Sequence, residues 1–342
     1  MEGRIRWGII GCGDVTEVKS GPAFARVPGS ALVAVMRRDG EKARDYAVRH
    51  GVPRWTDDAS EIIDADDVDA VYVATPPSSH AAYVRRVAAA GKPVYVEKPM
   101  ALHGPEGAAM VADCAAAAVP LFVAYYRRAL PRFEFVRACL YDGTIGEPTL
   151  VQLDLHQPPP DPAAANWRWD PDVGGDGLLL DVGSHGLDLV DHWLGPIADV
   201  DGRAATRLPW SRVADEVVGS FRFASGVLGV GTWGFGGSRR HDVVRVTGTH
   251  GSVSVPLLAE GPVRIEAADG SLREFVIEHP AHVQEPLVAT IVDELLGRDG
   301  RCPSTGASAL RTQGVMDALL ESWRRSDRAS GRAAPRGERD AD

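Results

Sequence analysis

The chain has 342 residues, of which 44% are hydrophobic and 25% are charged, which predicts a globular protein of about two domains. Its formal net charge of −10 argues against binding to nucleic acid, whose phosphates need a basic surface. No apolar run approaches the roughly 20 residues of a membrane span, no signal-peptide pattern opens the chain, and four scattered cysteines fit reduced thiols in a cytoplasmic protein.

The first 125 residues alternate short apolar runs with helical stretches. Apolar runs of this kind suit strands that are covered on both faces, so we expect an α/β domain with a parallel sheet over 1–125. Strands are predicted over 5–10, 31–36, 68–75, 94–96 and 121–125, and helices over 14–26, 40–50, 58–64, 79–90 and 104–118.

After residue 125 the pattern changes to a second α+β domain, predicted over 126–325, with a largely antiparallel sheet. The polar stretch 326–342 is predicted to be disordered, because it has almost no large apolar residue. Helices are predicted over 131–142, 181–194, 283–298 and 306–325, and strands over 148–157, 200–207, 217–223, 227–233, 242–248, 252–255, 263–267 and 273–277.

A glycine turn follows the first predicted strand and opens a helix, with the sequence Gly11-Cys12-Gly13-Asp14-Val15. Glycines there let the backbone turn tightly and approach a pyrophosphate at the helix N-terminus. Thr16 replaces the third small residue of the fingerprint, which predicts slightly looser packing of helix on strand. A plain strand–helix turn is the alternative, but the alternating pattern behind it favours a dinucleotide-binding Rossmann domain.

The second strand is expected to end at Met36, where NAD-specific folds place an acidic residue on the ribose. Arg37 and Arg38 follow instead. Paired guanidiniums can bind a 2′-phosphate that a carboxylate would repel, so NADP(H) is the preferred cofactor and NAD(H) remains possible. The alternative is two solvated arginines in a loop.

Glu97-Lys98-Pro99 stands at the carboxyl end of the strand predicted over 94–96, the edge at which open α/β sheets bind ligands. A lysine there can polarise a substrate oxygen or tune a neighbouring acid or base. Pro99 biases Lys98 towards extended geometry, which aims its ammonium out of the strand. A surface lysine before a turn is the alternative.

Asp181 and His185 are four residues apart in an apolar segment, so on a helix they share one face. A histidine titrates near neutrality and can move the proton that accompanies hydride transfer, with the carboxylate orienting its ring. A helix cap with a core histidine is one alternative. A metal site at His185, Asp188 and His192 is another, and we expect no metal because no further cluster of ligands appears.

Together these motifs resemble the Gfo/Idh/MocA oxidoreductases, over nearly the whole chain except the tail. The matching segments are G-x-G after the first strand, A-T-P-P-x-x-H at 74–80, A-G-K-x-V-x-x-E-K-P at 90–99 and G-G-x-G-x-L-x-D-x-G-x-H-x-x-D at 174–188. The resemblance implies a Rossmann domain followed by a domain with an open-faced sheet, which members often use to form oligomers.

The resemblance also implies roles for individual residues. His185 is the expected acid/base, with Lys98 and Asp181 tuning and positioning it. Tyr126-Arg127 stands where many relatives have Asn-Arg, which puts a substrate role for Tyr126 in doubt. Residues expected to contact the cofactor are Thr75, Pro76, His80, Glu97, Lys98, Trp167 and Arg168, and further candidates for substrate contact are Arg127 and His156.

The sequence therefore predicts an NADP-dependent dehydrogenase or reductase acting on a secondary alcohol or ketone of a sugar, cyclitol or related diol. The expected partner besides this carbohydrate-like substrate is a second copy of the chain, in a homodimer or homotetramer formed through the second sheet. Two alternatives stay open. One is redox-assisted cleavage of a glycoside with a retained nicotinamide, and the other is a non-catalytic NADP-sensing regulator of the same fold, which has no need of Lys98, Asp181 and His185 together.

Overall fold

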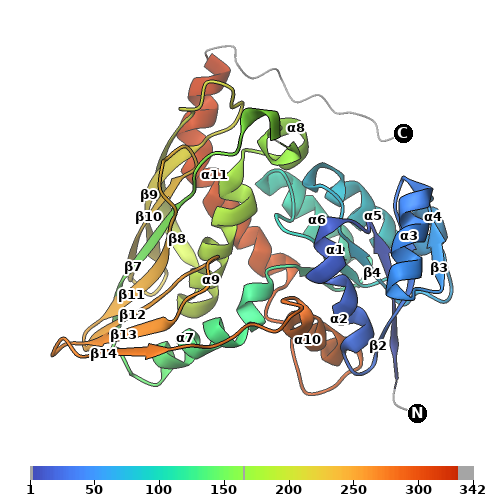
Figure 1. Ribbon diagram of the computed structural model, residues 1–342, viewed down its shortest axis with the longest axis horizontal. Coiled ribbons are helices and arrows are strands. Elements are labelled where there is room, and N and C mark those ends of the chain that lie inside the picture. The colour runs from blue at the N-terminus through green and yellow to red at the C-terminus, as the bar shows by residue number, and fades with distance from the viewer. Residues whose placement is uncertain (1–2, 165, 330–342) are drawn as a thin grey trace. The chain divides into compact units, whose positions relative to one another are not determined.

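The computed structural model describes residues 3–164 and 166–329 (Figure 1). The chain divides into two compact units. Unit 1 comprises Met1–Leu130 and His279–Leu310, and unit 2 comprises Pro131–Glu278 and Arg311–Asp342. The sequence-based division assigns 279–310 to the second domain, whereas the structure clusters this segment with the first. One reason is that the Ser304 hydroxyl donates to the carbonyl of Val123, 2.7 Å away, at the end of a strand of unit 1.

Unit 1 contains a six-stranded parallel sheet in the order β3-β2-β1-β4-β5-β6, which confirms the predicted α/β architecture. Its strands are β1 (Ile5–Ile10), β2 (Ser30–Met36), β3 (Arg54–Thr56), β4 (Ala70–Val73), β5 (Val94–Val96) and β6 (Leu121–Val123). The sequence analysis missed β3. This strand has three residues, lies at the edge of the sheet and exposes Trp55, so it lacks the apolar run that marks its neighbours.

The helices of unit 1 are α1 (Asp14–Val18), α2 (Gly21–Arg26), α3 (Gly40–His50), α4 (Ser60–Ile63), α5 (His80–Ala89), α6 (Gly104–Ala116) and α10 (Glu285–Leu295). The single helix predicted over 14–26 is therefore wrong in one respect, because the chain starts a new helix at Gly21. Pro22 has no N–H to continue the first helix and suits the first turn of the next one. A Cβ at Gly21 would lie 2.3 Å from the Thr16 carbonyl oxygen, so this tight junction requires glycine.

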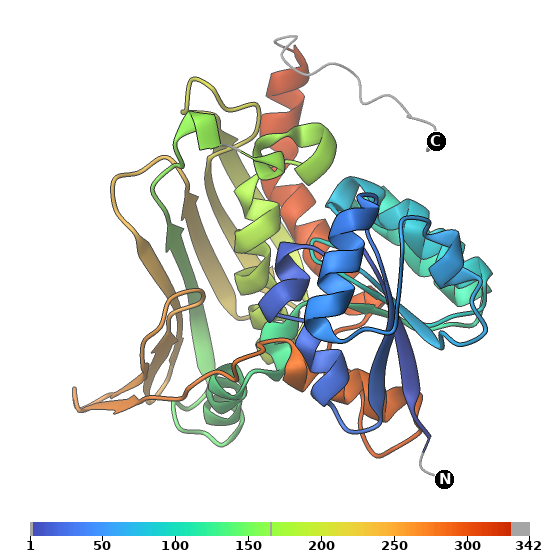
Figure 2. The ribbon, with the colours of Figure 1, turned by 45° about the vertical axis from the view of Figure 1, so that its right-hand side comes forward.

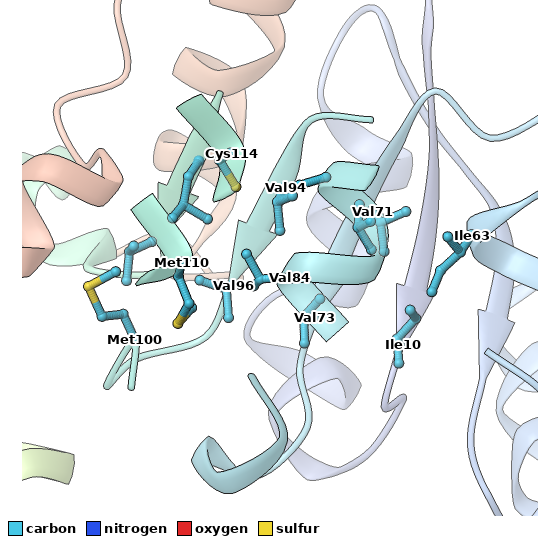
Figure 3. Packing of buried hydrophobic residues seen from close by; sticks show 14 of the residues in the cluster. Ile10, Ile63, Val71, Val73, Val84, Val94, Val96, Met100, Met110 and Cys114 are labelled. Carbon is cyan, nitrogen blue, oxygen red and sulfur yellow. The ribbon is translucent and has the colours of Figure 1, made fainter. Parts of the chain in front are cut away.

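One large hydrophobic cluster of unit 1 lies between the strands and helices α4, α5 and α6. Every residue of β4 and β5 is buried, as expected for strands that are covered on both faces. Figure 3 shows Ile10, Val71, Val73, Val94 and Val96 from the strands packed with Ile63, Val84, Met110 and Cys114 from the helices. This packing fixes the strands whose carboxyl ends carry the predicted cofactor-binding residues.

Unit 2 contains an eight-stranded sheet in the order β14-β13-β12-β11-β7-β10-β9-β8. Its strands are β7 (Pro148–His156), β8 (Ile197–Ala205), β9 (Glu216–Phe223), β10 (Leu228–Gly234), β11 (His241–Gly248), β12 (Gly251–Val255), β13 (Val263–Ala267) and β14 (Leu272–Phe275). Only the β7–β10 pair is parallel, so the predicted largely antiparallel sheet is confirmed.

Helices α7 (Pro131–Tyr141), α9 (Ser184–Leu194) and α11 (Gly306–Ala329) lie against one face of this sheet (Figures 1 and 2). The alternation along β7 agrees, because Val151, Leu153 and Leu155 are buried while Asp154 and His156 are half-exposed on the other face. We call the face that carries Asp154 and His156 the open face. Among the described residues, no helix combines the length and apolar character that a membrane span needs.

The C-terminal helix is longer than expected. The tail predicted to be disordered begins at Ser326, whereas α11 continues to Ala329, and the rest of that prediction, 330–342, lies outside the described residues.

The close approach of α11 to the sheet generates a stability prediction. A Cβ at Gly202 of β8 would lie 2.5 Å from the Cα of Leu319, whose backbone cannot move without shifting the helix. Gly202→Ala should therefore lower the free energy of unfolding by about 1–3 kcal/mol, as overpacking does.

Gly314→Ala is the matched control on α11 itself. A Cβ there would have no atom within 4 Å, so the better helix propensity of alanine should raise stability by up to about 1 kcal/mol. Denaturant unfolding measures both values. Equal stability of the Gly202→Ala variant and the unmodified protein would contradict the packing described.

Candidate functional site

The glycine turn in unit 1 has the geometry that its sequence predicts. Gly11 has a φ of 94°, and a Cβ there would lie 2.9 Å from the amide nitrogen of Thr75, so only glycine fits. The amides of Gly11 and Cys12 donate to the Met36 carbonyl at 2.8 and 3.0 Å, which ties the turn to the end of β2. At Gly13 the nearest atom to a Cβ would be 3.9 Å away, so the backbone there faces open space. The turn thus fits the pyrophosphate of a dinucleotide.

Thr16 replaces the third small residue of the fingerprint without loosening the turn. Its side chain is fully buried, and its hydroxyl donates to the Gly13 carbonyl at 2.8 Å and accepts from the Gly13 amide at 3.0 Å. The Tyr46 hydroxyl in turn donates to the Thr16 carbonyl at 2.9 Å. The hydroxyl thus closes the turn with hydrogen bonds that a glycine or alanine lacks.

The two arginines after β2 lie beside this turn. Arg37 is half-buried and its Nη1 lies 3.4 Å from the Cys12 carbonyl oxygen, while Arg38 is exposed. The nearest following carboxylate, Asp39, accepts from the Lys42 amide and pairs with the Lys42 ammonium at 2.9 Å. The hydrogen bonds from Lys42 lower the pKa of Asp39. The Asp39 carboxylate therefore caps α3. The charged group with a contact to the glycine turn is the guanidinium of Arg37.

His80 connects the ends of β4 and β5. Its ring is fully buried, with Nε2 2.8 Å from the carbonyl oxygen of Thr75 and Nδ1 3.1 Å from that of Pro99. Burial lowers the pKa of His80. The ring thus supports the Thr75-Pro76 turn and the Lys98-Pro99 segment from beneath, on the edge of the sheet that also carries the glycine turn.

Glu97 lies under Lys98 in a buried hydrogen-bond network. Its Oε1 accepts from the Tyr72 hydroxyl at 2.6 Å and from the Gln284 amide at 2.7 Å, and its Oε2 accepts from the Lys98 backbone amide at 3.1 Å. The Tyr95 hydroxyl completes the network by donating to the Gln284 carbonyl at 2.7 Å. Burial raises the pKa of both tyrosines well above the usual value, so both remain donors. The sequence analysis missed Gln284, since no local pattern marks a buried amide before α10.

In unit 2, Asp181 lies in a π-helical turn, Leu179–Gly183, that leads into α9. His185 is in the first turn of α9, and both side chains are buried, with exposed fractions of 8% and 4%. The helix predicted over 181–194 is therefore wrong at its start, where a wider turn replaces the α-helix. Such turns are rare and often occur at functional sites.

Arg168 binds Asp181 directly. Its Nε donates to Oδ2 of Asp181 at 2.7 Å, and its guanidinium lies over the Trp167 ring, 4.4 Å from the ring centroid. Both residues belong to a short 3-10 turn, Trp167–Trp169, whose preceding Asn166 accepts from the Arg168 amide. The structure thus brings the predicted Trp-Arg pair to the predicted catalytic aspartate.

Three further polar residues of α9, Asp188, Asp191 and His192, bind neighbouring helices. The Asp188 carboxylate accepts from Thr312 at 3.2 Å, Asp191 accepts two hydrogen bonds from Arg311, and His192 lies 3.3 Å from Glu134. Within the described ranges, no three histidine, cysteine or acidic side chains are arranged to hold a metal ion.

One of the two further substrate candidates belongs to unit 1, and the other lies on the open face of the unit 2 sheet. Arg127 belongs to unit 1, is buried, and donates to the Tyr126 hydroxyl at 3.0 Å. His156 is on the open face of the sheet, where its Nε2 lies 2.8 Å from Asp154, whereas α9 packs on the face that carries Leu153. The structure therefore separates His156 from the predicted catalytic pair within unit 2, and Lys98 belongs to unit 1.

Comparisons with known proteins show which family both parts of the chain match. Residues 5–125 match the oxidoreductase family with an NAD-binding Rossmann fold, and residues 133–254 match the GFO/IDH/MocA C-terminal domain. The chain is 36% identical to Oxidoreductase P35 of Formosa agariphila over 323 residues, which cover 93% of this chain and 99% of that protein. It is 26% identical to a scyllo-inositol 2-dehydrogenase (NAD(+)) of Bacillus subtilis, with 83% of each chain covered.

Among solved structures, the aldose-aldose oxidoreductase of Caulobacter crescentus superimposes with a TM-score of 0.81 at 26% identity, covering 94% of this chain and 98% of that one. The glycine turn, the Glu97-Lys98 strand end and the Asp181/His185 segment are thus found in a chain that matches known oxidoreductases over nearly its whole length. The chain belongs to the Gfo/Idh/MocA family of oxidoreductases.

Proposed function

We propose that this protein is an NADP(H)-dependent oxidoreductase that interconverts a secondary alcohol and a ketone on a sugar, cyclitol or related diol. The observation that carries the proposal is the buried Asp181/His185 pair, whose carboxylate is held by Arg168. Relatives named as an inositol dehydrogenase and an aldose oxidoreductase support a polyhydroxylated substrate.

The residues of unit 1 fit a bound dinucleotide. Gly11 and Gly13 leave room for the pyrophosphate, and Arg37 and Arg38 supply cations beside it for a 2′-phosphate. Thr75 and Pro76 flank the glycine turn from the end of β4, where His80 holds the backbone. When bound, the nicotinamide supplies or accepts the hydride.

The chemistry of the chain's own residues concerns the proton and the substrate oxygen. In the oxidation direction His185 takes the hydroxyl proton, and in reduction it returns a proton to the developing alkoxide. Lys98 stabilises negative charge on that oxygen. Asp181 orients the His185 ring, and Arg168 keeps the Asp181 carboxylate in place through their charge-assisted hydrogen bond.

Cofactor preference provides one test. Losing a charge-assisted contact costs about 1.5–3 kcal/mol, so Arg37→Ala or Arg38→Ala should weaken NADPH binding about tenfold or more and spare NADH. Arg44→Ala is a matched control, because Arg44 is an exposed arginine on α3. Calorimetric titration of each variant with both cofactors measures the effect. Equal affinity of the unmodified protein for NADPH and NADH would refute the preference.

Proton transfer provides a second test of the proposed function. His185→Ala should lower kcat by about 10²–10⁴-fold, the usual contribution of general acid–base catalysis, while leaving the NADPH dissociation constant nearly unchanged. The kcat of Lys98→Met should fall by a comparable factor and that of Asp181→Asn somewhat less. The losses should not add, because the three side chains are proposed to serve the same chemical step.

The matched control is His192→Ala on the same helix, where the histidine pairs with Glu134 instead. The assay follows reduced nicotinamide absorbance with a panel of sugars, inositols and dihydrodiols. Near-normal kcat in His185→Ala would mean that this histidine is structural.

We also propose that the open face of the unit 2 sheet pairs with a second copy of the chain. Val218, Leu228 and Val230 expose 51%, 55% and 40% of their surface on this face, and exposed apolar side chains that gather on one surface favour association. Light scattering should give an oligomer at micromolar concentration and a smaller mass for the Val218→Lys/Val230→Lys variant. Val48→Lys, at an exposed valine of α3, is the control. A monomeric mass for the unmodified protein would exclude this assembly.

A further inference from the structure

We propose that Gln284 is a positioning residue for Lys98, acting through the buried carboxylate of Glu97. The inference rests on the proposed function, in which Lys98 stabilises charge on the substrate oxygen. Gln284 belongs to the segment His279–Leu310, far along the chain from β5, yet its side chain is fully buried against the end of that strand.

The hydrogen bonds of the network direct three donors at Glu97. Glu97 receives three donors, from Tyr72, Gln284 and the Lys98 amide, an arrangement that fits a charged carboxylate. A proton on Oε1 would be directed at the hydrogens that Tyr72 and Gln284 donate, which is unfavourable. The amide orientation of Gln284 follows, because its NH₂ must face the carboxylate while its carbonyl accepts from Tyr95.

Gln284 is itself held from two sides. The backbone amide of Gln284 donates to the Lys19 carbonyl at 3.1 Å, just after α1. The backbone carbonyl of Gln284 accepts from the Val288 amide at 2.9 Å, where α10 begins. Its side chain therefore has a fixed origin from which to reach Glu97. A buried amide costs free energy unless both of its ends are bonded, and here both are.

The consequence for Lys98 follows from its own amide. The Glu97 side chain turns back onto the next residue of the chain, so the position of the carboxylate fixes the backbone from which the Lys98 side chain projects. Without the Gln284 donor, Oε1 keeps only the Tyr72 hydrogen bond, and a buried anion that has lost a donor moves to find another. Lys98 would then be displaced from the position it needs in catalysis.

Three variants test this role. Gln284→Leu removes the donor and should lower kcat about 10- to 100-fold at every pH, as a small misplacement of a catalytic group does, with little change in the cofactor dissociation constant. Tyr72→Phe should behave similarly but more mildly, and the double variant should lose less than the product, since both act on one carboxylate.

Gln284→Glu gives the sharper result, because it is the same size and places two carboxyl groups side by side. Such a pair shares one proton, which raises one of the two pKa values. While the proton is held, the new side chain donates to Glu97 and accepts from Tyr95 as glutamine does. Its kcat should therefore be near normal at low pH and fall about tenfold or more as pH rises and the shared proton is lost, whereas the unmodified protein lacks this transition.

Ser30→Ala is the control for loss of a buried hydrogen bond in unit 1. The Ser30 hydroxyl donates to the Phe24 carbonyl at 2.7 Å at the start of β2, so the kcat and pH profile of this variant should match the unmodified protein. A readout independent of turnover is the acylation rate of the Lys98 amine in cofactor-free protein, measured by peptide mass spectrometry relative to Lys92. This ratio should change severalfold in Gln284→Leu and remain constant in Ser30→Ala.

Two results would overturn the inference. One is a folded Gln284→Leu protein with normal kcat and an unchanged Lys98/Lys92 ratio, and the other is a pH profile of kcat for Gln284→Glu that is the same as that of the unmodified protein. If Gln284→Leu does not fold, Gln284→Glu below its transition keeps every hydrogen bond and carries the test. Failure of the unmodified protein to oxidise or reduce any polyol would refute the proposed function, while the acylation ratio would still decide whether Gln284 positions Lys98.

Discussion

A buried carboxylate needs hydrogen-bond donors, and at the end of β5 this requirement joins three segments of unit 1. Glu97 satisfies it with a tyrosine from β4, a glutamine that precedes α10 and the backbone of Lys98. Three segments that are remote in sequence therefore meet beneath the residue proposed to act on the substrate oxygen. Removing one donor would leave an anion without full compensation, which costs more than an ordinary hydrogen bond is worth. Arrangements in which Glu97 lacks one of these donors are therefore disfavoured. The fully buried His80 ring contacts the carbonyl oxygens of Pro99 and Thr75, and so connects this strand end to the turn at Thr75.

Unit 2 solves a similar problem with a charged partner. Asp181 is mostly buried in a π-helical turn, and Arg168 supplies a guanidinium at hydrogen-bond distance. The arginine is partly exposed, so the pair gains less from its charges than a buried pair would, but the stacking of Trp167 limits the orientations of the guanidinium. The other acidic residues of α9 bind Thr312 and Arg311 and so anchor the helix on α11. Along this helix, the residues that hold the fold are thus distinct from those proposed for chemistry.

The sequence predicted most of the secondary structure, and the misses have identifiable causes. Strands that are buried on both faces were found because their apolar runs are continuous, whereas β3 has three residues and an exposed tryptophan. The helix predicted over 14–26 breaks at Gly21, where the backbone of α1 comes too close for any side chain. The start of α9 was expected to be α-helical, but a π-helical turn forms where Gly183 packs against the Trp233 ring, with a Cβ there only 3.1 Å from it.

By itself the sequence determined which chemical groups stand at the ends of which elements: the glycine turn after β1, two arginines after β2, a lysine after β5, and an aspartate and a histidine four residues apart. These assignments are local, because a strand's length, a turn's glycine and a helix's periodicity are set by neighbours in the chain. Only the tertiary structure decided which side chains bind these groups. Gln284 reaches Glu97 across 187 residues, Arg168 pairs with Asp181, and His156 faces away from α9. Such pairings depend on how distant segments pack, and burial then selects the partners that leave no polar group unsatisfied.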